Sequence, residues 1–164
     1  MKKDNLRELF VDGLKDLYDA EHQLIDALPK MAEASSSNDL RTGFETHLEQ
    51  TRQQARRLEQ VFSDMGIRPE RKKCLGMQGI IKEGEQVMEE TRSDPDTRDA
   101  GMIASAQKVE HYEISGYGTA RTYAQTLGMD HVAQLLETTL KEESATDEKL
   151  TRIAERHINV EAMS

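Results

Sequence analysis

The chain has 164 residues, of which 36% are hydrophobic, 32% charged and 4% aromatic, with no Trp and three Pro. This composition is typical of long, solvated helices and disfavours a β-sandwich. The formal net charge of −9 argues against nucleic acid or an anionic membrane as a partner, because both require a basic face. The length predicts one domain, residues 1–164.

The one cysteine, Cys74, cannot form an internal disulfide, so a reducing compartment is expected. Residues 1–4 lead directly into an amphipathic pattern with no apolar stretch typical of a secretory signal. No uncharged apolar segment approaches the roughly 20 residues that span a bilayer. The sequence therefore predicts a cytoplasmic protein.

The first half of the chain predicts two long helices and a short one. The first helix is expected over 4–33, and the second from about residue 38 to 65, with Ser37 or Asn38 as its cap and Gly66 as its stop. Residues 67–73 form a basic loop that contains a proline. A shorter amphipathic helix follows, with Met77 and Ile80 among its apolar residues.

The second half predicts two more long helices. Asp94-Pro95 is a start signal, with the aspartate as N-cap and the proline at the first helical position. This helix is expected to end at Leu127, before Gly128, and Asp130 is expected to cap the last helix. The short first and last loops make each helical hairpin antiparallel, and the long connection over 65–95 permits a crossover. The predicted fold is all-α, a ferritin-like four-helix bundle with one long crossover that carries a short extra helix.

A glutamate interrupts the apolar seam of the first helix. The seam residues recur at spacings of three and four, typical of a helix packed against others: Phe10, Leu14, Leu17, Leu24 and Leu28. Glu21 stands where a leucine would be expected, and Glu110 and Glu143 interrupt two later seams in the same way. Because a buried carboxylate is costly unless it is paired, three such interruptions indicate a bound metal.

The glutamates also occupy matching levels in the two predicted hairpins. Glu21 and Glu49 are equidistant from Ser35 in the first turn, and the midpoint of Glu110 and Glu143 falls just before Gly128. Glu113 shares a helical face with Glu110, and Asp147 lies one turn after Glu143 and could reinforce it. An oxygen-rich site of this kind suits divalent Fe, Mn or Mg. The competing interpretation is that these carboxylates are half-exposed or paired with Lys or Arg.

Other reactive side chains are weaker candidates. His22 and His111 each follow a seam glutamate by one residue, which places them about 100° around the helix and away from the site. His47 is ambiguous from the sequence. Cys74 follows a basic loop that could lower the pKa of its thiol, although a buried packing role is the better interpretation. Three tyrosines are expected to lie in the core and to donate their hydroxyl groups to nearby carboxylates: Tyr18, Tyr112 and Tyr117.

Over nearly its whole length the chain resembles the YciE/YciF-type ferritin-like stress proteins of bacteria. The resemblance rests on residues 17–24, 47–51, 73–77, 104–114, 117–119, 142–143 and 145–147, with Gln-Lys-Val-Glu-His-Tyr-Glu at 107–113 the most specific segment. It implies a ferritin-like bundle, usually a homodimer, with a dinuclear metal centre. Carried over from ferritin-like proteins, Glu21 and Glu110 would be single ligands, and Glu49 and Glu143 would begin two Glu-x-x-His motifs.

The chain departs from that motif at both histidine positions, which hold Arg52 and Thr146. A guanidinium has no lone pair for a metal, so Arg52 could instead pair with a site carboxylate. The first functional hypothesis is a stress-response protein that binds Fe or Mn through Glu21, Glu49, Glu110, Glu113 and Glu143 and consumes peroxide or dioxygen. The alternative is a non-catalytic helical stress protein whose buried carboxylates are neutralised by Arg52, Lys108, Arg121 or protons.

Overall fold

The computed structural model describes residues 4–164. Their helices are, in chain order, α1 (Leu6–Ala34), α2 (Asn38–Asp64), α3 (Leu75–Glu90), α4 (Pro95–Thr126), α5 (Asp130–Ile153), the π-helical turn η1 (Ala154–Ile158) and α6 (Asn159–Glu161). No strand occurs among these described residues. Within the same range, no helix has the length and apolar character needed to cross a membrane.

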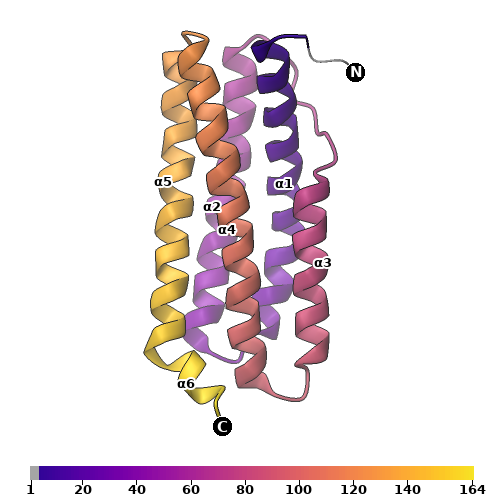
Figure 1. Ribbon diagram of the computed structural model, residues 1–164, viewed down its shortest axis with the longest axis vertical. Helices are drawn as coiled ribbons and strands as arrows, with labels where there is room; N and C mark the ends of the chain where they lie inside the picture. Colours follow the sequence, from indigo (N-terminus) through magenta and orange to yellow (C-terminus); the bar gives the residue numbers. More distant parts are fainter. Residues whose placement is uncertain (1–3) are drawn as a thin grey trace.

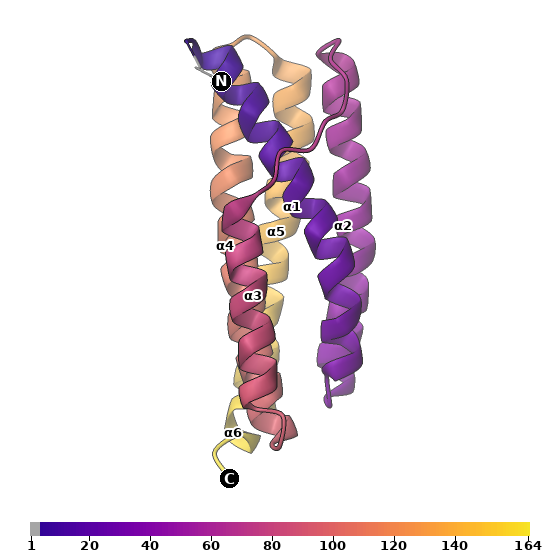
Figure 2. The same ribbon diagram turned by 90° about the vertical axis from the view of Figure 1, so that its right-hand side faces the viewer.

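Four long helices, α1, α2, α4 and α5, run along the length of the molecule and form the bundle (Figure 1). Helix α1 packs against α2 and α4, and α5 packs against the same two helices. Helix α3 lies outside the bundle against α4 and α1. The chain between α2 and α3 passes beside α1, so that α2 and α4 run parallel (Figure 2). The predicted ferritin-like bundle with one long crossover is therefore confirmed.

Local sequence signals explain where the helices begin. The side chains of Asn5, Ser37, Cys74 and Asp94 accept hydrogen bonds from the first-turn backbone of α1, α2, α3 and α4, respectively, as N-caps do. The prediction for the last long helix is wrong, because Asp130 is its first residue and not its cap. Met129 holds the cap position and makes no side-chain capping bond.

The helix ends at Gly66 and Gly128 also follow the prediction. These glycines have φ angles of 67° and 71°, the left-handed conformation that ends many helices and disfavours residues with a Cβ. In each case the next residue's N–H closes back on the helix, Ile67 on Phe62 at 3.0 Å and Met129 on Ala124 at 2.9 Å. Gly66 and Gly128 therefore fix where α2 and α4 end and where the following turns begin.

The interior divides into two apolar clusters along the bundle axis. One contains Leu24, Phe44 and Met102, towards the α1–α2 turn. The other contains Phe10, Phe62 and Leu136, towards the α4–α5 turn. In α1, Glu21 falls between the two clusters, since Leu17 belongs to the second and Leu24 to the first. A polar layer thus separates two hydrophobic cores.

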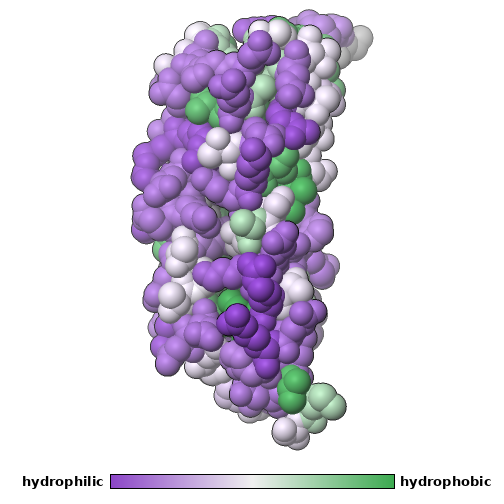
Figure 3. All heavy atoms as spheres, turned by 90° about the vertical axis from the view of Figure 1, so that its left-hand side faces the viewer, coloured by the Kyte–Doolittle hydropathy of each residue, from purple (hydrophilic) through white to green (hydrophobic). Residues whose placement is uncertain are grey.

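The outer face over α5 is mainly hydrophilic, with small scattered apolar patches (Figure 3). Ion pairs such as Lys141–Glu137 and Arg152–Glu148 lie on this helix. Such exposed pairs contribute little to stability and mainly keep the surface solvated. The buried glutamates lie in the interior, between the two apolar clusters.

Candidate metal centre

Four glutamates form the polar layer inside the bundle. Glu21 on α1, Glu110 and Glu113 on α4, and Glu143 on α5 have exposed fractions of 0%, 0%, 0% and 1%. Each occupies an inward position of its own helix, as the apolar seams around it predict. The structure therefore brings together four of the five glutamates proposed from the sequence.

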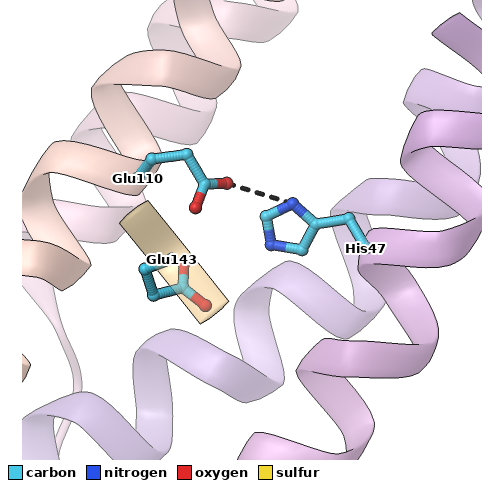
Figure 4. A group of neighbouring side chains, drawn as sticks. All are labelled: His47, Glu110 and Glu143. Atoms are coloured by element: carbon cyan, nitrogen blue, oxygen red, sulfur yellow. Dashed lines mark ion pairs between the residues drawn. The ribbon is translucent and has the colours of Figure 1, made fainter. Parts of the chain in front are cut away.

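A histidine from α2 completes the cluster. His47 is 3% exposed, and its Nδ1 atom lies 3.0 Å from Oε1 of Glu110. One ligand atom from each of His47, Glu110 and Glu143 lies within 4.8 Å of the others. Figure 4 shows these three side chains pointing towards one another from three helices. This spacing is compatible with a single ion bound between them.

Many polar atoms of the layer have no hydrogen-bond partner among the described residues. They include both carboxylate oxygens of Glu113 and one atom from each of five other side chains: Glu110 Oε2, Glu21 Oε2, Glu143 Oε2, His47 Nε2 and Gln54 Oε1. Buried polar atoms are normally satisfied, since leaving one unpaired costs about 1–3 kcal/mol. A cation bound in this layer would provide a partner for these unpaired oxygen and nitrogen atoms.

The electrostatics of the layer favour uptake of positive charge. Burial is the main cause that raises the pKa of all four glutamates, to about 8 for Glu110. Repulsion adds to it: Glu143 raises the pKa of Glu21, and Glu21 raises that of Glu113. Burial lowers the pKa of His47, so that its imidazole is neutral and keeps a lone pair for a metal.

The basic residues named in the alternative hypothesis are occupied elsewhere. Arg52 lies 3.5 Å from Glu49, Lys108 lies 3.3 Å from Glu83, and Arg121 pairs with Glu137 at 2.6 Å. The other partners in these pairs lie outside the buried layer. These three residues therefore do not neutralise the layer, which leaves protons, metal cations and the more distant Arg57, whose charge lowers the pKa of Glu21.

Glu49 does not join the cluster, contrary to the sequence prediction. Its side chain is 55% exposed and lies 3.5 Å from Arg52 and 3.7 Å from Arg56. The prediction is wrong because the matching of levels along a hairpin says nothing about rotation around the helix axis. His47, two residues earlier, points inward, and a step of two residues turns a helix by about 200°.

The inward face of α2 at this level is polar, so the spacing of apolar residues does not identify it. His47, Thr51 and Gln54 are buried there, whereas Leu48 is only partly buried. Their spacing of four and three residues matches that of a seam, so the signal was present as a polar stripe. Phe44 and Leu58 continue the same face at each end.

Asp147, His22 and His111 make their contacts outside the carboxylate layer, although the charge of Asp147 contributes to the raised pKa of Glu110. Asp147 accepts a hydrogen bond from Gln107 at 3.3 Å and lies 3.2 Å from Nε2 of the exposed His111. His22 packs edge-on against Tyr18, with ring centroids 4.7 Å apart. The reinforcing role expected for Asp147 is therefore not seen, and the predicted displacement of His22 and His111 from the site agrees with the structure.

The tyrosines and the cysteine bind carboxylates at different places. Tyr117 is buried and donates its hydroxyl to Glu21 within the layer. Tyr112 donates to Asp16 at 2.7 Å and lies 3.0 Å from Sγ of Cys74. Burial raises the pKa of the Cys74 thiol, so the packing interpretation of this residue is supported.

A family model described as a domain of unknown function, DUF892, matches residues 5–163. The chain belongs to the DUF892 family. YciF of Escherichia coli strain K12 is 45% identical to it over 163 residues, which cover 99% of this chain and 98% of YciF. The resemblance seen in the sequence is therefore confirmed.

Solved structures related to this DUF892 chain share its fold. The crystal structure of YciF, described as an E. coli stress protein, matches with a TM-score of 0.91 and 44% identity over 96% of this chain and 99% of that one. YcfI of Rhodopseudomonas palustris, for which a structural role has been suggested, matches with a TM-score of 0.89 and 41% identity over 92% and 97%. A protein of Xanthomonas campestris at 23% identity and a TM-score of 0.77 shows the fold alone.

Proposed function

We propose that this DUF892 protein binds divalent metal ions in a dinuclear centre inside the bundle. The ligands would be the four inward glutamates and one histidine: Glu21, His47, Glu110, Glu113 and Glu143. The observation that carries the proposal is the set of buried, unpartnered carboxylate oxygens with no Lys or Arg paired to them among the described residues.

The donor set fits Fe²⁺ or Mn²⁺ best. Carboxylate oxygens with one imidazole nitrogen suit these borderline ions, whereas Mg²⁺ prefers oxygen donors alone. Two divalent ions carry four positive charges, which four ionised glutamates would neutralise. That balance would remove the cost of burying the carboxylates.

The four glutamates and His47 would hold and orient the ions, and Tyr117 would fix Glu21 through its hydrogen bond. Bound Fe or Mn would supply redox chemistry towards peroxide or dioxygen. The apolar clusters on both sides of the layer would exclude bulk water from it. A stress-related role, by analogy with YciF, is part of this proposal.

Metal analysis of matched variants tests the proposal. Protein purified without chelator is compared as wild type, Glu110→Gln and Glu49→Gln, which change one buried and one exposed carboxylate. Glu49→Gln should retain the metal content of the wild type, and Glu110→Gln should lose most of it. Equal metal content in all three proteins would contradict the proposed site.

A second candidate is a metal-free structural protein whose layer is neutralised by protons. The raised pKa of Glu110, about 8, favours it, as does the structural role suggested for YcfI. Thermal unfolding with Mn²⁺ and with a chelator separates the two functions, because a ligand of the native state raises the melting temperature. An identical melting temperature in both conditions would support the metal-free protein.

A further inference from the structure

The carboxylate layer is sealed from solvent, so a cation needs a route through the bundle wall. A hydrogen-bonded path to the surface begins at Glu143. The side-chain amide of Gln54 donates to Glu143 and also to Oε2 of Glu142, the latter at 3.1 Å. Gln54 is fully buried on α2, and the two glutamates are consecutive on α5. One amide therefore joins a buried carboxylate to its outer neighbour.

Glu142 is the outer end of this path. Its side chain is 23% exposed, in contrast to 0–1% for the inward glutamates. Arg57 holds it with two hydrogen bonds of 3.0 Å, one to each carboxylate oxygen. The guanidinium also donates to Thr139 Oγ1 at 2.7 Å, a contact that does not depend on the carboxylate. Arg57 is a cation bound where an incoming cation would first arrive.

Gln54 has an oxygen to offer as well as its amide hydrogens. Its Oε1 atom is buried and has no hydrogen-bond partner among residues 4–164. An amide oxygen is a neutral ligand that divalent cations accept alongside carboxylates. The amide nitrogen faces both carboxylates in this structure, so a rotation of the amide about its last side-chain bond would bring the oxygen towards them. In that orientation the oxygen could hold an ion without adding to the negative charge of the layer.

We propose that Glu142, Gln54 and Arg57 form an uptake relay for divalent cations at the seam between α2 and α5. Glu142 captures the ion in exchange for Arg57, and Gln54 passes it to Glu143. At rest, Arg57 occupies Glu142 and slows exchange with solvent. The relay rests on the proposed metal centre and adds to it the residues that set the rate of loading.

A second approach to the layer runs between α1 and α4 and is less suitable. A groove of about 230 Å³ there is lined by one carboxylate, Asp16, and by Leu17, and by none of the four inward glutamates. The Leu17 side chain lies so close to Gly116 that a Cβ at that glycine would stand 2.7 Å from Leu17 Cδ2. An ion would meet a closed apolar contact at this point, whereas the α2–α5 seam is lined by the polar side chains of Glu142, Gln54 and Glu143.

Stopped-flow uptake of Co²⁺, followed by its visible absorption, tests the relay in the full-length protein. Glu142→Gln should slow uptake at least about tenfold, the lower end of what local charge does to the rate of capture. Arg57→Gln should speed it several-fold, because the competing cation is gone. Co²⁺ stoichiometry and affinity at equilibrium should stay within about twofold of wild type, since the ligands of the centre are unchanged. Glu148→Gln and Arg152→Gln, which alter an exposed pair on α5, should leave the rate unchanged.

Both substitutions break the same ion pair, but the relay predicts opposite changes in the uptake rate. A purely structural pair would make Glu142→Gln and Arg57→Gln change the rate in the same direction, and that outcome overturns the relay. Unchanged rates in both variants, with normal binding, also overturn it and point to the α1–α4 groove. If wild-type protein takes up no Co²⁺, the metal centre fails together with the relay. The failure of each proposal is thus distinguishable.

Discussion

At the scale of single residues, the position of an acidic side chain around its helix decides whether it is buried in the carboxylate layer or exposed to solvent. Glu49 and Glu110 are the same residue type on neighbouring levels, yet one is 55% exposed and the other fully buried. The exposed carboxylate lies beside Arg52 and Arg56, an interaction worth little in solvent. The buried carboxylate has the neutral His47 and a second carboxyl, Glu143, beside it, so its charge must be met by protons or a metal.

Substitution of His47 tests whether the buried layer binds metal through this histidine. His47→Ala should weaken Mn²⁺ or Fe²⁺ binding by at least about tenfold, a loss at the lower end of those seen when even the partners of metal ligands are changed. The matched control is His111→Ala, since His111 is 69% exposed and pairs with Asp147. Equilibrium competition against a chelator measures both affinities. Equal affinities in the two variants would remove His47 from the ligand set.

At the scale of helices, α3 depends on close contact with α4. A Cβ on Gly76 would lie 2.5 Å from the ring of Tyr112, and one on Gly101 would lie 2.5 Å from Cγ1 of Val87. These glycines let α3 lie directly on α4, where Met77 becomes fully buried. The start of α3 is fixed by Cys74, whose backbone N–H also donates to Asp19 at 2.8 Å.

A pair of glycine substitutions within α3 tests this contact. Gly76→Ala should destabilise the protein by about 1–3 kcal/mol, since the added methyl overlaps the Tyr112 ring. In Gly79→Ala the new Cβ would have no atom of the rest of the protein within 4 Å, so this variant should stabilise the helix by up to about 1 kcal/mol. Urea unfolding of the two variants measures both changes. A similar gain in stability from both would show that α3 is not held closely against α4.

At the scale of the whole molecule, the bundle brings like charges together at the expense of its own stability. Four glutamates from three helices share one buried layer between two apolar clusters. Their raised pKa values mean that the metal-free fold holds protons that the unfolded chain releases. Stability conferred by those protons is complete below a pH of about 4.5 and is lost as the pH rises through the folded values, about 8 for Glu110.

Metal-free protein should therefore become less stable between pH 7 and 8. For each carboxyl that keeps its proton in the folded state, the free energy of unfolding falls by about 1.4 kcal/mol per pH unit. This corresponds to roughly 4 °C in melting temperature for a domain of this size. This window lies above pH 6.5, so the lowered pKa of His47 has little influence. Thermal unfolding in chelator measures the slope, and Glu110→Gln should reduce it. A flat profile would show that the layer is already ionised without metal.

Bound metal should remove this pH dependence or reverse it. Metal ions replace the protons of the carboxyls, so their affinity increases as the pH rises. Melting temperatures with saturating Mn²⁺ should accordingly stay level or increase from pH 7 to 8. The difference between the two profiles is the contribution of metal to folding stability.

The sequence by itself determined the helices, their antiparallel hairpins and four residues of the candidate site. Glu21, Glu110 and Glu143 could be identified because each interrupts an apolar seam, and the inward direction of a residue follows from the seam of its own helix. Glu113 followed from Glu110 by helical periodicity. Asp94-Pro95 and Gly128 marked their helix ends because capping is a local property of the backbone.

Only the tertiary structure decided which face of α2 meets the other helices. His47, Thr51 and Gln54 are polar, so hydropathy could not mark their stripe as the inward one, and Glu49 was chosen from its level alone. The rotation of α2 about its axis is set by packing of Phe44 and Leu58 into clusters that other helices build. The pairing of Arg57 with Glu142 likewise joins residues 85 positions apart, which no local pattern predicts. Periodicity specifies a helix face, and contact between helices specifies its partner.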